Sequence, residues 1–489
     1  MAVEATIEGP AWTGQGLDES AGRYPLRVEG AVFRLVDILL PGIITTTRHA
    51  RMYALHALAW PEAEARGLDA EQGAEFVRRC EVVIAAVSHF HSPHRRRLSS
   101  AHGDIELPNF VSNDVLDVKE AAEFGGMSTS GFGGVYVGPS IRVGLLSPDQ
   151  PPRQGERAEL GALREGLGDL LTLADRDEIA VSELQEAGHL CLCNGAEAPD
   201  GLFLRRLFFE EAEEERTDDR YRELTTRMFL ESIRAEPVPD VTRRFQEHWG
   251  FGGALGDPEA DQVAYVASGW RAAILRNFSV GAWRALWRWL ALQLRDPMTV
   301  EQLGARLAEE IGDLSVSDLV DSLPERVEGQ SLLAAELEIE SEDWTPLQGL
   351  RMLTLGAKRL DDLEGPIRKM FIGPDPADLG PVWFAERLNE WQAHSVRALA
   401  DELTAMLVRR AKRVSLSKMR LIDGRPWVPT RLRDRDGLLS VHGEEGAGSV
   451  SLRTSSLSEV SAGLGLVDRD EDWIARITPL GEELYERLG

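Results

Sequence analysis

Apolar residues recur at helical spacing through most of this chain, and this pattern limits the fold more than any other feature. Residues 32–39 place valine and leucine at i, i+3, i+4 and i+7, the order of one helical face. Residues 283–294 repeat this pattern with tryptophan and leucine in a wider stripe. The spacing predicts helices packed on a core, and it favours core packing over base stacking for these tryptophans.

Helix start and stop signals give approximate boundaries. The first helix should end at Pro41-Gly42, and a second should begin in the threonine run at 45–47 and end before Pro61. A third is predicted over 70–90, and Thr299-Val-Glu-Gln302 is the pattern of a capping box that opens a later helix.

Two short stretches interrupt the helical pattern. FGGMSTSGFGGVYVG at 124–138, followed by IRVGLL, predicts a glycine loop with short strands, and SPDQPPRQGERAE at 147–159 has the composition of a linker. The glycine loop lacks a P-loop lysine, its glycines do not fit the dinucleotide fingerprint, and the chain has no G-x-S-x-G motif. We therefore assign no catalytic residue and predict no cofactor.

The C-terminal segment has a different order of elements. Residues 452–464 are compatible with a short helix, and 465–467 and 474–478 with two strands around the turn DRDED. PLGEELYERL at 479–488 then predicts a closing helix. Helix, tight hairpin and helix is the order of a winged-helix module.

These signals predict a mainly α, multi-domain helical protein with a small Gly-rich β element in its N-terminal half and a C-terminal winged-helix domain. The 489 residues suggest about three folded domains. The expected parts are a flexible arm at 1–25, a helical domain at 26–147, a linker at 148–159, a helical domain at 160–408, and a basic segment with the winged helix at 409–489.

Composition favours a reducing compartment. Three cysteines cannot build a disulfide framework, the N-terminus does not have the pattern of a signal peptide, and no apolar run approaches membrane-spanning length. We therefore expect a cytoplasmic protein with no membrane partner. The formal net charge of −27 opposes non-specific adhesion to nucleic acid or anionic lipid.

One segment is strongly basic, in contrast to the rest of the chain. Residues 409–435 hold ten basic residues and only two aspartates. Such a basic block is typical of proteins that contact the phosphate backbone of nucleic acid. The alternative is that these residues pair with the chain's own acidic runs or with an acidic protein partner. The candidate nucleic-acid-binding residues are Arg409, Arg410, Lys412, Arg413, Lys418, Arg420, Arg425, Arg431, Arg433 and Arg435.

A weaker anion-binding candidate lies near the second predicted helix. In TTTRHAR at 45–51, free amides of a helix start, threonine hydroxyls and arginines would suit an anion; simple capping by threonine is the alternative. The three arginines at 95–97 are a further anion candidate. The residues in question are Thr46, Thr47, Arg48, Arg51, Arg95, Arg96 and Arg97.

Two segments carry possible metal ligands without a spaced motif. SHFHSPHRRRLSSAHGD at 88–104 contains His89, His91, His94 and His102. GHLCLC at 188–193 contains His189, Cys191 and Cys193, and Cys80 could supply a fourth ligand. Neither segment matches a known metal-binding spacing, and the three arginines at 95–97 disfavour a cation. We assign no metal ligand from the sequence, and a solvated connector is the simpler interpretation of 88–104.

Three stretches together resemble uncharacterised helical proteins encoded in prokaryotic phage-defence gene clusters. They are the LPGI…TRHAR segment before a tyrosine-bearing helix, GHLCLC ahead of LFLRRLFF, and the terminal GLVDRDEDWIARITPLG. The resemblance implies a defence complex that handles DNA beside a separate nuclease or helicase, and it implies no catalytic residue in this chain.

The function expected from these features is a non-enzymatic subunit of a DNA-processing or anti-phage defence complex. It would contact the nucleic-acid backbone through its C-terminal basic region, binding DNA weakly alone and more tightly with other protein subunits. The alternative is a metal-dependent hydrolase or nuclease that uses the N-terminal histidines.

Overall fold

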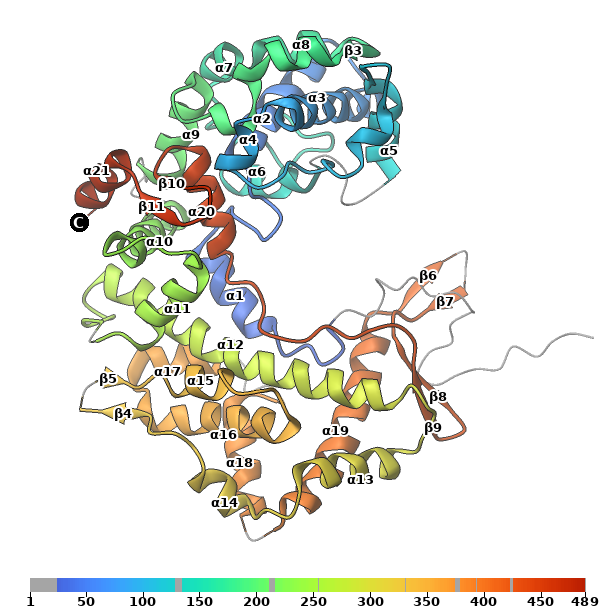
Figure 1. The fold of residues 1–489 in the computed structure, drawn as a ribbon, viewed down its shortest axis with the longest axis vertical. Coiled ribbons are helices and arrows are strands. Elements are labelled where there is room, and N and C mark those ends of the chain that lie inside the picture. The colour runs from blue at the N-terminus through green and yellow to red at the C-terminus, as the bar shows by residue number, and fades with distance from the viewer. Residues whose placement is uncertain are drawn as a thin grey trace, which may run out of the picture. The chain divides into compact units, whose positions relative to one another are not determined.

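The computed structural model describes residues 24–127, 134–210, 216–253, 255–329, 331–373, 379–392, 394–422 and 425–488 (Figure 1). These residues are mainly helical, which confirms the expected fold class. They form two compact units, each of which combines distant parts of the chain. Unit 1 is the described part of Met1–Leu35 with Trp249–Val450, and unit 2 is Val36–His248 with Ser451–Gly489.

This division differs from the domains expected from the sequence. Helices α1 (Gly30–Leu39) and α11 (Val241–Phe251) each run from one unit into the other, and the expected linker at 148–159 lies within unit 2. Ser147 N–H donates to the Arg153 carbonyl at 3.0 Å, so this stretch folds back on itself. The expected 409–489 domain is divided at residue 450, and residues 1–23 of the expected arm lie outside the described residues.

Unit 2 contains the first long helices, a three-stranded antiparallel sheet of order β1-β2-β3 and the C-terminal elements. Its helices and strands are α2 (Ala50–Ala65), α3 (Ala70–Phe90), α4 (His94–Arg97), η1 (Leu107–Phe110), β1 (Val111–Ser112), β2 (Val115–Asp117), α5 (Val118–Met127), η2 (Gly134–Tyr136), α6 (Val137–Arg142), α7 (Leu160–Ala174), β3 (Glu178–Ala180), α8 (Val181–Glu186), η3 (Gly188–Leu190), η4 (Leu192–Asn194), α9 (Pro199–Phe209), α10 (Thr217–Arg234), α20 (Thr454–Gly463), β10 (Val467–Arg469), β11 (Ala475–Ile477) and α21 (Pro479–Arg487).

Helix α2 is the centre of unit 2, because it packs against α3, α7, α9 and α20. It begins at Ala50 rather than in the threonine run, because the Thr47 hydroxyl is used in a turn with Ile44 and the His49 N–H donates to the Tyr136 hydroxyl. Pro61 lies inside the helix and does not end it. Helix α3 has the predicted bounds and starts with a capping box at Asp69.

The predicted strands after the glycine loop are wrong. Residues 128–133 of the loop lie outside the described residues, and IRVGLL contributes to helix α6 and the turn that follows it. The small β element is instead built by β1, β2 and β3, with Leu116 of β2 opposite Val111 of β1 and Ile179 of β3.

Unit 1 is a helical body whose described strands pair as short antiparallel hairpins, β4 with β5, β6 with β7, and β8 with β9. Its elements are α12 (Gln262–Gln293), α13 (Val300–Ile311), α14 (Val316–Asp321), β4 (Val327–Glu328), β5 (Ser331–Leu332), α15 (Ala335–Glu340), α16 (Pro346–Asp362), α17 (Gly365–Ile372), α18 (Pro381–Trp391), α19 (Val396–Ser417), β6 (Arg420–Ile422), β7 (Arg425–Trp427), β8 (Leu432–Arg435) and β9 (Leu438–Val441).

Helix α12 is the core of unit 1 and packs against α16 and α17 (Figure 1). Asp261 caps its start by accepting from the N–H groups of Val263 and Ala264. Trp283 and Trp287 are buried, as the helical stripe predicted. The capping box of Thr299 and Gln302 is also confirmed at the start of α13. No helix among the described residues has the length and apolar character needed to cross a membrane.

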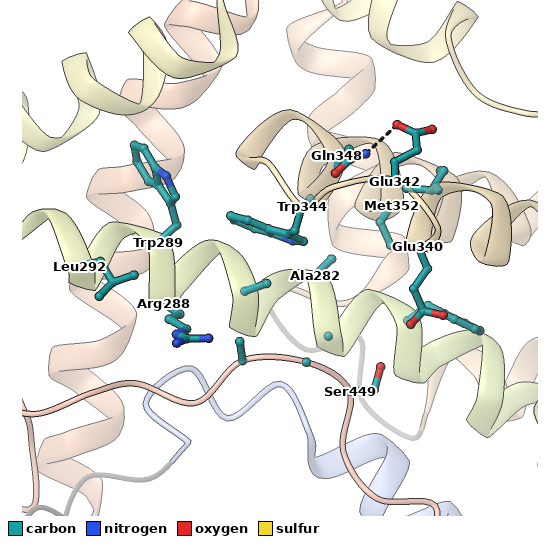
Figure 2. Close-up of a pocket in the computed structure, with 17 residues that line it drawn as sticks. Ala282, Arg288, Trp289, Leu292, Glu340, Glu342, Trp344, Gln348, Met352 and Ser449 are labelled. Atoms are coloured by element: carbon teal, nitrogen blue, oxygen red, sulfur yellow. Dashed lines mark hydrogen bonds between the residues drawn. The ribbon is translucent and has the colours of Figure 1, made fainter. Parts of the chain in front are cut away.

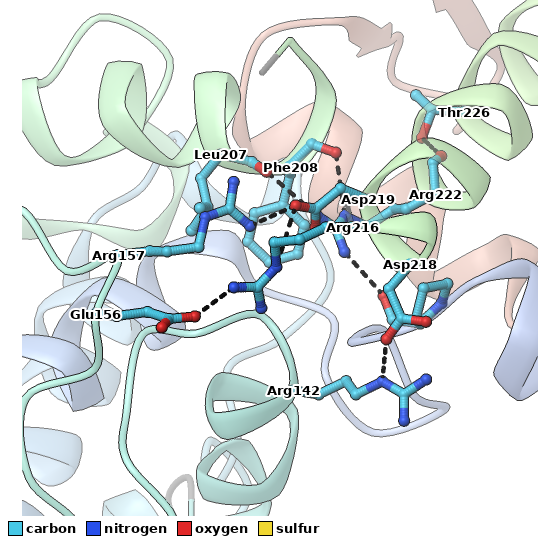
Figure 3. A network of polar contacts seen from close by, with 11 residues as sticks. Arg142, Glu156, Arg157, Leu207, Phe208, Arg216, Asp218, Asp219, Arg222 and Thr226 are labelled. Carbon is cyan, nitrogen blue, oxygen red and sulfur yellow. Dashed lines mark hydrogen bonds and ion pairs between the residues drawn. The ribbon is translucent and has the colours of Figure 1, made fainter. Parts of the chain in front are cut away.

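A buried carboxylate connects several segments of unit 2 (Figure 3). Arg157 and Arg222 contact the two oxygens of Asp219 at 2.7 and 2.6 Å, and Arg216 lies 3.6 Å from it. Arg222 also donates to the carbonyls of Leu207, Phe208 and Pro41. One aspartate therefore holds α9, α10 and the segments at 41 and 157 together.

We expect Asp219→Asn to lower the free energy of unfolding by about 3–5 kcal/mol, because it leaves buried arginines without their counter-charge. Urea denaturation followed by circular dichroism measures the change. Asp218→Asn is the matched control, since the neighbouring Asp218 pairs with Arg142 at the surface and should change stability by about 0.5 kcal/mol or less. Equal effects of the two substitutions would contradict the assignment.

Candidate functional site

The four histidines of 88–104 do not form one cluster. His89 Nδ1 lies 2.6 Å from an Asp104 carboxylate oxygen, and His102 Nε2 lies 2.8 Å from the Thr46 carbonyl. His94 Nε2 lies 3.0 Å from the Ser99 carbonyl. His91 caps the end of α3. The histidines are therefore divided among separate partners within unit 2.

Two of them meet the two cysteines of GHLCLC. His91 Nδ1 lies 3.4 Å from Cys193 Sγ, and His94 Nδ1 lies 3.5 Å from Cys191 Sγ. The two sulfurs are 3.2 Å apart and are not joined in a disulfide. Two segments that are far apart in the sequence thus converge, and we call His91, His94, Cys191 and Cys193 the His–Cys cluster.

The histidine of GHLCLC and the third cysteine lie elsewhere. His189 is exposed and pairs with Asp169 at 3.1 Å, and Cys80 is buried in α3. Among the described residues, the one group of histidine, cysteine and acidic side chains close enough to share an ion contains His91, Cys191 and Cys193. The idea that Cys80 completes a site with GHLCLC is therefore not supported.

The environment of the two thiols in the cluster differs. The hydrogen bond with Cys193, together with His94, lowers the pKa of the Cys191 thiol. The same hydrogen bond and burial raise the pKa of Cys193. Burial raises the pKa of Cys80, which behaves as an inert apolar residue.

Arg51 holds the cysteine turn in place. Its Nη1 donates to the carbonyls of His189 and Cys191 at 2.7 and 2.9 Å. Its Nε and Nη2 bind both oxygens of Asp200 at 2.9 Å, and Nη2 also donates to the Gly166 carbonyl. All five guanidinium N–H groups therefore have a partner.

The prediction that Arg51 binds an anion is wrong, because this side chain is fully buried and its donors are used inside unit 2. Thr47 is buried in its own turn, and the Thr46 carbonyl accepts from His102. Arg48 is exposed, so it is the arginine of TTTRHAR that faces solvent.

The other anion candidates lie beside the cluster. Arg96 and Arg97 are exposed on α4, and the side chain of Arg95 lies outside the described part of the chain. The hydrogen bond with Cys191 and burial raise the pKa of Cys193, and the nearby charge of Arg97 acts in the opposite direction.

A residue of the C-terminal segment also helps to position the His–Cys cluster. Glu459 of α20 accepts from both the N–H and the hydroxyl of Ser99 at 3.0 Å, and it pairs with Arg469. Ser99 in turn binds His94 through its carbonyl. Nothing in the local sequence pattern indicated Glu459 or Asp200 as supporting residues, because their partners lie far away in the chain.

The C-terminal elements have the predicted order of helix, hairpin and helix. The hairpin pairs Val467 with Ile477, and Ala475 also bridges to Val238. Most residues of α20 are buried within unit 2, including Leu457 and Glu459. Helix α20 therefore offers little free surface with which to enter a DNA groove.

Several basic residues of 409–435 are used inside unit 1. The block includes Arg410, which donates to the Leu26 carbonyl at 2.6 Å, Lys418, which donates to the Tyr24 carbonyl at 3.1 Å, and Lys412, which pairs with Asp434. It also includes Arg433, which is buried and donates to the Thr430 carbonyl, and Arg431, which pairs with the buried Glu445. The alternative of pairing within the chain therefore applies to about half of the block.

Three of the remaining basic residues face solvent. Arg409 is exposed on α19, Arg420 at the start of β6, and Arg435 at the end of β8. Arg413 is also exposed on α19, where it is engaged in an interaction. The side chain of Arg425 lies outside the described residues. We call Arg409, Arg420 and Arg435 the arginine surface.

An apolar cavity of about 380 Å³ lies apart from these residues in unit 1 (Figure 2). Figure 2 shows Trp344 above Ala282 of α12, with Arg288 at one end and Glu340 and Ser449 at the other. The cavity has room for an apolar group, and none of the sequence-predicted site residues line it.

No family model matches this chain, and no curated protein or solved structure shows significant similarity to it. The resemblance to phage-defence proteins stays a prediction from the sequence.

We expect Arg51→Lys to lower the free energy of unfolding by about 3–5 kcal/mol, because a lysine cannot replace five directed N–H donors around a buried aspartate. Arg48→Lys is the matched control from the same segment and should be neutral within about 0.5 kcal/mol. Thermal and urea denaturation of both variants test this. Similar stability of the Arg51 variant and the wild type would show that the buried pair is dispensable.

Proposed function

We propose that the protein is a non-enzymatic, cytoplasmic subunit of a DNA-processing or anti-phage defence complex that contacts the nucleic-acid backbone through the arginine surface. The observation that supports this is the exposure of Arg409, Arg420 and Arg435 on α19 and two neighbouring hairpins of a chain that is otherwise strongly acidic. Guanidinium groups suit phosphate because they present several N–H donors in one plane.

Exposed apolar side chains accompany these arginines. Met419, Leu421 and Leu438 are 51, 72 and 45% exposed, and all three lie on or beside the same hairpins. Proteins that bend DNA insert such side chains between base steps while arginines contact phosphates. The proposed contact is therefore made by the hairpins of unit 1 rather than by the helix of the winged-helix-like segment.

The hydrolase alternative has less support. It needs the histidines of 88–104 to share one ion, whereas His89 and His102 are bound to Asp104 and to a backbone carbonyl. A non-enzymatic role as one subunit among several agrees with the small number of exposed arginines, because a few phosphate contacts give weak binding unless partners add more.

Charge reversal in the full chain tests the proposal. Arg409→Glu, Arg420→Glu and Arg435→Glu together should weaken binding to unrelated duplex DNA sequences about equally. The slope of log affinity against log salt should become shallower by about 2.7, or about 0.9 for each phosphate that the chain no longer neutralises. Fluorescence anisotropy over a range of salt concentrations measures both effects.

The matched control reverses three exposed arginines elsewhere in unit 1, Arg295, Arg306 and Arg397. It changes the net charge by the same amount and should leave most of the binding intact. Equal weakening in the two triple variants would mean that net charge alone acts. Absence of DNA binding by the wild type at low salt would assign the arginine surface to a protein partner. An isolated 409–489 fragment is unsuitable because it divides between the two units.

A further inference from the structure

We propose that the His–Cys cluster binds one zinc ion through His91, Cys191 and Cys193, with His94 as a positioning residue beside Cys191. This inference is independent of the proposed function, since the cluster lies in unit 2 and the arginine surface in unit 1. It departs from the sequence-based expectation that no residue binds a metal.

The spacing of the donor atoms of His91, Cys191 and Cys193 fits tetrahedral zinc, whereas His94 lies outside the group that is close enough to share an ion. Bonds of about 2.3 Å to sulfur and about 2.0 Å to nitrogen place two sulfurs about 3.8 Å apart and each sulfur about 3.5 Å from a nitrogen. The Sγ–Nδ1 distances are 3.4 Å for Cys193 with His91 and 3.5 Å for Cys191 with His94. The sulfurs are slightly closer, at 3.2 Å. The donors of His91, Cys191 and Cys193 all lie within 4.8 Å of one another.

His94 positions one of the two cysteine ligands. Its Nε2 lies 3.0 Å from the Ser99 carbonyl, which can only accept, so Nε2 carries the proton and Nδ1 has a free lone pair toward Cys191. Ser99 is itself held by Glu459. Groups that orient a metal ligand in this way contribute to metal affinity without binding the ion themselves.

Hydrogen bonds in the turn that contains Cys191 and Cys193 also favour metal binding. The Cys193 N–H donates to Cys191 Sγ at 3.4 Å, and Arg51 binds the Cys191 carbonyl. Amide hydrogen bonds to sulfur stabilise the thiolate form that binds the ion. Two thiolates balance the charge of a divalent ion, so the nearby Arg97 is compatible with it. The arginines at 95–97 therefore do not exclude a cation, contrary to what their sequence position suggested.

The ligand types and burial indicate zinc. Two sulfur donors and one imidazole donor match zinc better than the oxygen-preferring magnesium or calcium. Cys191 and Cys193 are buried, and the chain supplies three of the four positions of tetrahedral zinc. The ion would join the end of α3 to the η3–η4 turn, about a hundred residues later in the chain.

Metal analysis of the full-length wild type is the first test. Protein expressed with added zinc should contain one zinc ion per chain by mass spectrometry of the metal. X-ray absorption should show two sulfur neighbours and one imidazole nitrogen, with a further light atom at the fourth position. Protein without a stoichiometric metal would overturn the proposal. Fewer than two sulfur neighbours would also overturn it, because one of the two cysteines would then lie outside the site.

Substitutions assign the ligands. Cys191→Ser with Cys193→Ser, and separately His91→Ala, should reduce bound zinc by at least about tenfold, the scale of effect seen even for supporting groups around a metal. Cys80→Ala and His189→Ala are the controls for the remaining cysteine and the adjacent histidine, and they should retain zinc. Retention of zinc in both ligand variants would refute the assignment. Because the wild-type absorption measurement does not depend on variants, poor folding of a variant leaves the proposal testable.

Discussion

The packing of unit 2 depends on Arg51, because every N–H group of its buried guanidinium donates a hydrogen bond. From α2, this side chain binds Asp200 in α9, the Gly166 carbonyl in α7 and the turn that carries Cys191. A buried cation is tolerated because every N–H group and both carboxylate oxygens are engaged. The arrangement is tight: a Cβ at Gly166 would lie 2.0 Å from an Asp200 oxygen, so a glycine is required there. The position of the cysteines is therefore a consequence of this buried pair.

The same use of arginine recurs in both units and changes how the composition is interpreted. Arg222 in unit 2 binds Asp219 and three carbonyls, and Arg359 in unit 1 binds Glu336 at 2.9 and 2.6 Å while also donating to carbonyls. A lysine, with a single ammonium group, could not connect so many acceptors in fixed directions. Basic residues in this chain are often internal connectors, so a count of basic residues in a segment overestimates the charge that the surface presents.

The sequence predicted what depends on local order. The stripe at 283–294, the capping box at Thr299 and the C-terminal order of helix, hairpin and helix all follow from spacing within one or two turns of chain. The helix start at Ala50 was missed because Tyr136, far along the chain, binds the His49 N–H. The His–Cys cluster was missed for the same reason: each half has an uninformative spacing, and only the fold brings His94 to Cys191. Long-range polar contacts leave no periodic signal in a single sequence.

The surroundings of the His–Cys cluster show how unit 2 holds distant segments of the chain together. Cys191, Cys193 and His94 are buried. Around them, the buried Arg51 and Glu459 bind backbone and side-chain groups that orient these residues. The cluster and the arginine surface therefore differ in kind: buried polar contacts hold unit 2 together, whereas unit 1 exposes the cations on which the proposed nucleic-acid contact depends.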